Sequence, residues 1–290
     1  MSVTASGLTS QAGLIPVVKF LDHIGFEQTI NQTVPHQRGG NADYQLADMM
    51  LLAVVGVIGG ATSIAKLCTV WSDGVLREVA GWLKRPVETT VSRLFKEVTE
   101  KQISQLESVT HKLRGQIWRK ANRAGVSKVG LNPVQWIDID STVDSVCGTQ
   151  EGAAKGYNPK KKGAFSYHPQ LAFWAGSKEI VQAWFRTGSA YTSNGVVEFV
   201  KQLLAHLPSK TRLIIRADSG YFVGVLLDLL DAHKHGYLIK VKFKNLVVLL
   251  TGQQWIAIAG QPDWEQCTFY YWHKKGLDEK HLSLCILWSQ

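Results

Sequence analysis

Two stretches decide the fold: Trp136-Ile137-Asp138-Ile139-Asp140-Ser141-Thr142 and Leu213-Ile214-Ile215-Arg216-Ala217-Asp218-Ser219-Gly220-Tyr221. In each, an apolar and largely β-branched run ends in an aspartate that directly precedes a serine, which predicts two strands with a carboxylate at the tip. A carboxylate at the end of a buried strand is costly unless a cation or a metal ion pairs with it. Asp140 and Asp218 are therefore the first candidates for functional residues.

The alternation of the first strand assigns its side chains to two faces. One face carries Trp136, Asp138, Asp140, Thr142 and Asp144, and the other carries Ile137, Ile139 and Val143. The acidic face is either solvent-exposed without function or part of a site. The second run, residues 212–217, reads as a fully apolar strand, which predicts burial on both faces.

Ligands of open α/β sheets collect at the carboxyl ends of the strands. If the two strands are neighbours, Asp140 and Asp218 lie close enough for one divalent ion to bridge them. Mg²⁺ prefers a few carboxylates together with water and phosphate oxygens, and two-ion sites suit displacement at phosphorus. The pattern therefore predicts a metal-dependent site that acts on phosphate.

The charge of the chain favours a polyanionic partner. The 290 residues carry a net charge of +9, with a pI near 9.3. Three stretches contain no Asp or Glu, namely residues 109–137, 152–178 and 232–262, and they surround the two acidic strings. Each stretch alone is typical of a solvated face or loop, but together they indicate a track for a phosphate backbone. The glycine-rich residues 152–169, with their lysines and aromatics, suit a flexible loop that closes on DNA, or a mobile solvated loop.

Periodicity divides the chain into three regions. Residues 14–130 read as helical, with segments at 14–25, 44–67 (interrupted at Gly59-Gly60), 75–83 and 88–106. From residue 132 the order is β-β-β-α-β-α-β, which predicts an α/β domain with a mixed sheet. Its helix at 193–207 would take Ser193 or Asn194 as N-cap. The domains expected are a helical, DNA-binding region at 1–131, a catalytic core at 132–245, and the start of a β-rich insertion at 246–290.

Other classes of protein are disfavoured. The four cysteines form no CxxC pair and the nine histidines form no HExxH pattern, which argues against zinc. The N-terminus lacks the features of a signal peptide, and the apolar residues 49–61 are too few to cross a bilayer. We expect a cytoplasmic protein.

Four motifs together resemble the DDE transposases of bacterial insertion sequences. They are Asp140-Ser141-Thr142, the string from Gln150 to Lys161, His168-Pro169, and Arg216-Ala217-Asp218-Ser219-Gly220. The resemblance covers nearly all of the chain and is most specific over residues 136–242. It implies a ribonuclease H-like catalytic domain behind a helical DNA-binding region. It also implies Mg²⁺ or Mn²⁺ as cofactor, with Asp140 as the first metal-binding acid, Asp218 as the second, and Asp138 as an alternative for the first.

The third acid of that family is a glutamate on a late helix, which this sequence does not show. The late acids Asp263, Glu265, Asp278 and Glu279 flank β-like segments at 266–273 and 281–288. We therefore expect a chain truncated inside a β-rich insertion, with a site that binds metal weakly and catalyses poorly.

The function implied is DNA transposition by phosphodiester hydrolysis and strand transfer. Double-stranded DNA, as terminal inverted repeats and target, is the expected partner, on which the chain could form a homodimer. The residues expected to contact DNA are Lys155, Lys160, Lys161, Lys162 and Arg216. The alternatives are an inactive DNA-binding remnant and a ribonuclease H-like nuclease that completes its site with Glu265 or Glu279.

Overall fold

The computed structural model describes residues 8–36, 38, 42–126, 134–208, 211–241, 246–273 and 280–289. It forms two compact units, Met1–Val129 and Gly130–Gln290, each with its own core. The division falls two residues before the one expected from the sequence.

The first unit is helical in its described part, as the sequence predicts. Its core surrounds Trp71, whose indole Nε1 donates to the Leu52 carbonyl at 3.0 Å and whose ring lies 4.2 Å from that of Trp82. The elements are η1 Ala12–Leu14, α1 Ile15–His23, α2 Phe26–Thr33, α3 Leu46–Ile58, α4 Ile64–Val70, α5 Gly74–Val79, α6 Glu88–Glu97 and α7 Glu100–Arg123.

The helix expected at residues 88–106 is two helices, so that prediction was wrong. The chain breaks at Val98 and Thr99, and the Thr99 side chain caps α7 by accepting from the Gln102 backbone N–H. Gln102 in turn accepts from the Thr99 backbone N–H at 2.9 Å, which completes a capping box. Because the box satisfies donors that a continuous helix would pair internally, it favours a new helix start here.

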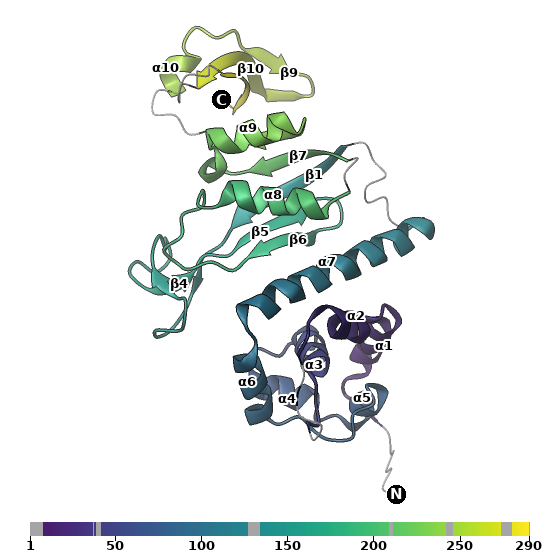
Figure 1. The fold of residues 1–290 in the computed structure, drawn as a ribbon. Helices are drawn as coiled ribbons and strands as arrows, with labels where there is room; N and C mark the ends of the chain where they lie inside the picture. Colours follow the sequence, from purple (N-terminus) through teal and green to yellow (C-terminus); the bar gives the residue numbers. More distant parts are fainter. Residues whose placement is uncertain are drawn as a thin grey trace, which may run out of the picture. The chain divides into compact units, whose positions relative to one another are not determined.

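The second unit is built on a five-stranded mixed sheet in the order β6-β5-β1-β7-β8 (Figure 1). β1, β7 and β8 are parallel, β5 runs antiparallel to β1, and β6 runs antiparallel to β5. The sheet and its helices comprise β1 Val134–Ser141, β5 Gln170–Trp174, β6 Glu179–Trp184, α8 Val196–His206, β7 Arg212–Ala217, η2 Ser219–Tyr221, α9 Gly224–Ala232 and β8 Gly236–Ile239. A mixed sheet behind an all-helical region is the fold class expected, and it is confirmed.

One face of the sheet is buried and the other is open. Ile137, Ile139, Leu213 and Ile215 are at most 3% exposed, on the face where α8 and α9 pack against the sheet and each other. Residues at alternate positions are half-buried or exposed, and Trp136 and Arg216 are among the exposed ones. The prediction that β7 is buried on both faces was therefore wrong, because Arg212 and Arg216 place charge on its open face.

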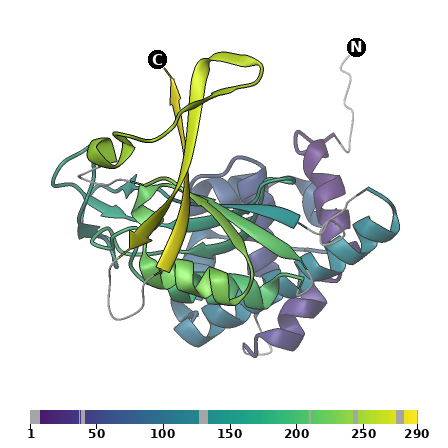
Figure 2. The same ribbon diagram turned by 90° about the horizontal axis from the view of Figure 1, so that it is seen from above.

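Two smaller sheets complete the second unit. β2 Asp144–Ser145, β3 Ala154–Lys155 and β4 Phe165–Tyr167 form one in the order β2-β4-β3, so part of the loop expected at 152–169 is a hairpin. Asp144 lies in this sheet and does not share the acidic face of β1. The other sheet contains β9 Ile256–Ile258 and the long pair β10 Gln261–His273 and β11 Lys280–Ser289 (Figure 2), after α10 Leu246–Leu250.

Two local expectations also need revision. The N-cap of α8 is Gly195, with φ of 71° and no capping side chain, where Ser193 or Asn194 was expected. Any Cβ at this position would meet the Trp184 ring at 2.8 Å, so the packing requires glycine. The strand expected at 237–242 is β8, and Lys242 lies outside the described residues. No described helix is both long and apolar enough to cross a bilayer.

Candidate active site

Asp140 and Asp218 end neighbouring parallel strands at the same edge of the sheet. The register pairs Asp138 with Arg216 and Ile139 with Ala217, so the next residue on each strand is one of the two acids. Both acids follow the alternation that points Asp138 and Arg216 to the open face, and both are exposed. The strands therefore bring the two predicted acids level with each other.

Local backbone hydrogen bonds orient each carboxylate. The Ser141 N–H donates to Asp140 Oδ1 at 2.7 Å, and the Gly220 N–H donates to Asp218 Oδ1 at 3.0 Å. Within the described part of the chain, the other oxygen of each carboxylate accepts no hydrogen bond. Two fixed carboxylates with available oxygens form a donor set of the kind that hard divalent cations prefer.

A buried polar cluster supports the end of β1. The Ser141 hydroxyl lies 3.0 Å from His168 Nε2 and 3.2 Å from Thr192 Oγ1. His168 is 4% exposed, and its Nδ1 lies 2.5 Å from the Ala190 carbonyl oxygen, which requires the proton on Nδ1. Nε2 is then an acceptor, and the Ser141 hydroxyl donates to it. The residue after Asp140 is thus tied to the loop that follows β6.

Arg186 holds that loop in place. Its Nε donates to the His168 carbonyl at 3.0 Å, and its Nη1 donates to the carbonyls of Tyr191 and Asn194 at 3.2 and 3.0 Å. Burial lowers the pKa of its guanidinium from the ordinary value, although the group stays charged. Arg186 therefore connects the start of the loop to its end.

The charges of both carboxylates act on the buried phenol of Tyr221. Its side chain is fully buried, and burial raises the pKa of its phenol. The charges of Asp140 and Asp218 raise this pKa further, while Ser141 and Arg186 lower it. No hydrogen bond of standard geometry reaches its hydroxyl among the described residues. Because both acids act on one phenol, they share one electrostatic environment.

The structure separates Asp140 from Asp138, the alternative first acid. Arg216 donates to both oxygens of Asp138, at 2.7 and 2.8 Å, and its guanidinium lies 5.8 Å from the centre of the Trp136 ring. This partnership raises the pKa of Arg216. Asp138 is thus neutralised by Arg216, whereas no cation of the described residues forms an ion pair with Asp140. Arg216, expected to contact DNA, has Asp138 as its partner here.

The predicted lysines lie on the small sheet and its turn. Lys155 is on β3, with Nζ 5.4 Å from the centre of the Phe165 ring. The buried Asn158 side chain accepts from the backbone N–H groups of Lys160 and Lys161, at 3.2 and 2.9 Å, and donates to Ser145. The turn is therefore fixed by internal hydrogen bonds while the side chains of all four lysines, including Lys162, are exposed.

Two glycines join the hairpin of β3 and β4, which carries the four lysines and is called the lysine hairpin below, to the loop after β6. A Cβ on Gly156 would lie 1.8 Å from the Gly188 carbonyl oxygen, and a Cβ on Gly188 would lie 2.3 Å from the carbonyl oxygens of Ala154 and Ser166. A backbone bridge between Tyr167 and Thr187 lies beside them. Since His168 and Arg186 tie the same loop to the end of β1, the lysine hairpin is linked to the carboxylates.

Among the described residues, no third acid lies beside Asp140 and Asp218 in a metal-binding group. No group of three His, Cys, Asp or Glu suited to a metal ion occurs in the parts of the chain that the structure describes. Glu265 lies on β10, in a different sheet from Asp140 and Asp218, and Asp278 and Glu279 fall outside the described residues. Sequence reasoning also missed the cluster of Ser141, Thr192, Arg186 and Tyr221, and for His168 its only signal was the His-Pro motif.

Comparison with known proteins decides the family. The family described as "Transposase DDE domain group 1" matches residues 1–268. The chain belongs to this family of DDE transposases. The recognition made from the sequence motifs is thereby confirmed, and members of the family generally use divalent metal ions.

Solved transposase structures resemble the chain at low sequence identity. A piggyBac transposase synaptic complex with hairpin DNA is 12% identical with a TM-score of 0.41, and the match covers 98% of this chain and 62% of that one. A pre-cleavage Mos1 transpososome is 9% identical with a TM-score of 0.27, covering 83% of this chain and 81% of that one. This DDE transposase chain thus spans less than two thirds of the piggyBac chain. A search of curated proteins finds no match.

Proposed function

We propose that this chain carries out the chemistry of DNA transposition. A water molecule attacks a phosphodiester at the element end, the bond from phosphorus to the 3′ oxygen breaks, and a 3′-hydroxyl and a 5′-phosphate result. The freed 3′-hydroxyl then attacks a phosphodiester of the target DNA and displaces a new 3′-hydroxyl. The observation that supports this proposal best is the level placement of Asp140 and Asp218 at the ends of two parallel strands.

The residues at this edge fit a divalent ion. Both acids are exposed and offer hard oxygen donors, and each is oriented by a backbone N–H group. Asp140 and Asp218 would hold Mg²⁺ or Mn²⁺, which when bound supplies Lewis acidity at phosphorus and a more acidic water. With these two carboxylates as the acids found at this edge among the described residues, water and substrate oxygens must complete the coordination. We therefore expect slow turnover.

Other residues of the chain position the two acids and bind DNA. The Ser141–His168 hydrogen bond restrains the backbone beside Asp140, and Arg186 restrains the loop that carries Thr192. The exposed lysines at 155 and 160–162 suit contacts with phosphates of double-stranded DNA, which fix register without reading sequence. A dimer on DNA would bring two element ends together.

The proposal is tested with a plasmid that carries the coding region and its flanking DNA. The full chain is incubated with the plasmid and Mn²⁺ or Mg²⁺, and nicked and joined products are quantified. We expect slow nicking that Asp140→Asn and Asp218→Asn each reduce at least 100-fold, the order of magnitude for loss of a charge-stabilising group in an active site. Asp138→Asn is the matched control, because Asp138 lies on the same strand face but pairs with Arg216.

The outcomes separate the alternatives. Nicking that survives both Asp140→Asn and Asp218→Asn overturns the proposal. DNA binding without any metal-dependent nicking leaves the DNA-binding remnant as the better account. Robust nicking without joining, lost on Glu265→Gln or Glu279→Gln, identifies a nuclease.

A further inference from the structure

The C-terminal half of α7 is strongly basic. Residues 108–126 contain five Lys and Arg and no Asp or Glu, whereas the first half of α7 contains Glu100 and Glu107. Cations in the last turn of a helix are favoured by its dipole, which accounts for Lys120 and Arg123. Lys112 and Arg119 lie farther back, so the dipole of α7 does not account for them.

These two cations border a groove between α2 and α7. The groove has a volume of about 290 Å³, and its lining includes Thr29, Gln32 and Thr33 from α2 and Lys112, Gln116 and Arg119 from α7. No carboxylate lines it among the residues that the structure describes. Lys112 Nζ donates to Thr33 Oγ1 at 3.0 Å, which directs the ammonium across the groove toward the end of α2. The groove thus combines two cations with uncharged hydrogen-bonding groups.

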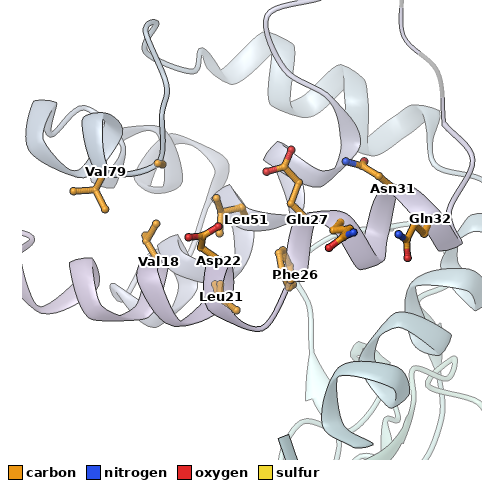
Figure 3. Close-up of a pocket in the computed structure, with 12 residues that line it drawn as sticks. Val18, Leu21, Asp22, Phe26, Glu27, Asn31, Gln32, Leu51 and Val79 are labelled. Carbon is orange, nitrogen blue, oxygen red and sulfur yellow. The ribbon is translucent and has the colours of Figure 1, made fainter. Parts of the chain in front are cut away.

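A second pocket beside α2 has the opposite character. A pocket of about 460 Å³ there is lined by the carboxylates of Asp22 and Glu27 and by apolar side chains that include Val18 and Phe26 (Figure 3). Burial raises the pKa of Glu27, and the charges of Asp48 and Asp22 raise it further. A polyanion is repelled from that pocket. α2 therefore borders both an acidic pocket and a basic groove within one unit.

We propose that the groove between α2 and α7 binds the phosphate backbone of duplex DNA. Lys112 and Arg119 are seven residues apart, which corresponds to about 10 Å along a helix axis. Phosphates on one strand of B-DNA follow each other by about 3.4 Å along its axis, so the two cations span about three of them. Thr and Gln side chains commonly donate to phosphate oxygens as well. The contact is additional to that of the lysine hairpin.

The choice of duplex DNA as the occupant rests on the proposed function, so the test measures binding without metal or catalysis. Fluorescence anisotropy of the full chain with a duplex of arbitrary sequence is recorded from about 50 to 200 mM salt. The double variant Lys112→Ala/Arg119→Ala should reduce the slope of log affinity against log salt by about 1.8, since each phosphate contact contributes about 0.9. The control Lys96→Ala/Lys101→Ala removes the same charge from exposed positions beside Glu97 and Glu100, and it should leave the slope unchanged.

A second variant keeps both cations and adds an acid. Gln116→Glu places a carboxylate in the groove and should weaken binding, whereas Gln105→Glu, three turns earlier on α7, should weaken it less. Equal slopes for the two double variants, or equal losses for the two glutamate variants, would overturn the groove proposal. The proposed function would still stand in that case if plasmid nicking continued to depend on Asp140. A wild-type chain that binds no DNA overturns both.

Discussion

Substitution of Gly188 by alanine tests how the lysine hairpin is joined to the active-site loop. The new Cβ would lie 2.3 Å from two backbone carbonyl oxygens and 2.5 Å from Ser166 Oγ, about 1 Å closer than ordinary contacts allow. Because two of these neighbours are backbone atoms, rotation of a side chain does not relieve the contact. The hairpin or the loop must move.

The expected cost of this overpacking is about 1–3 kcal/mol of unfolding free energy. Each kcal/mol lowers the Tm of a domain of 150–250 residues by about 2–4 °C, so a decrease of about 2–12 °C is expected. DNA affinity should also fall, although no charge is lost, because the hairpin carries Lys155 and its neighbours. Thermal unfolding by circular dichroism and DNA anisotropy at fixed salt measure the two effects.

Gly176→Ala is the matched control. Gly176 lies in the turn between β5 and β6, where a Cβ would only touch the Trp174 ring at 3.7 Å, an ordinary contact. This variant should change neither property. If Gly188→Ala matches Gly176→Ala in Tm and in DNA affinity, the inferred link between the hairpin and the loop is wrong.

Three further predictions concern binding, a helix cap and a buried phenol. Replacing the three lysines of residues 160–162 with alanine should reduce the slope of log DNA affinity against log salt by up to about 2.7, while Asp140→Asn should not weaken binding. An unchanged slope in the triple variant would show that these lysines do not contact DNA. Thr99→Ala should cost about 1 kcal/mol by removing the cap of α7, against little change for the exposed Thr110→Ala, as measured by urea unfolding. Tyr221→Phe should be neutral or stabilising at pH 8, because its buried hydroxyl makes no hydrogen bond of standard geometry with a described residue. Since the folded-state pKa of Tyr221 is raised above its ordinary value of 10.0, the wild type should lose stability relative to this variant above about pH 10; parallel pH profiles would contradict that assignment.

The strands that carry the two acids could be predicted from sequence because their signals are local. Alternation in β1 correctly placed Ile137 and Ile139 on the buried face and Asp138 and Asp140 on the other. The break before α7 was also readable, since Thr99 and Gln102 have the spacing of a capping box, but the apolar spacing on both sides concealed it.

The connections between distant residues could not be predicted in this way. The pairing of Arg216 with Asp138 depends on the register of β1 and β7, which are 78 residues apart at that point. The contact between Gly156 and Gly188 arises only when a hairpin and a loop meet, and a glycine in a sequence does not identify the backbone it will touch. For the same reason the sequence shows the motif that contains His168 but does not predict that His168 holds Ser141.

The central claim is that Asp140 and Asp218 together bind a divalent ion, and direct Mn²⁺ titration tests it most simply. Isothermal calorimetry on the full chain, without DNA, compares the wild type with Asp140→Asn, Asp218→Asn and the control Asp138→Asn. We expect Mn²⁺ affinity to fall about tenfold or more in the first two variants, equivalent to about 1.4 kcal/mol, and to change little in the third. Loss of Mn²⁺ binding in Asp138→Asn with retention in Asp140→Asn would contradict the assignment.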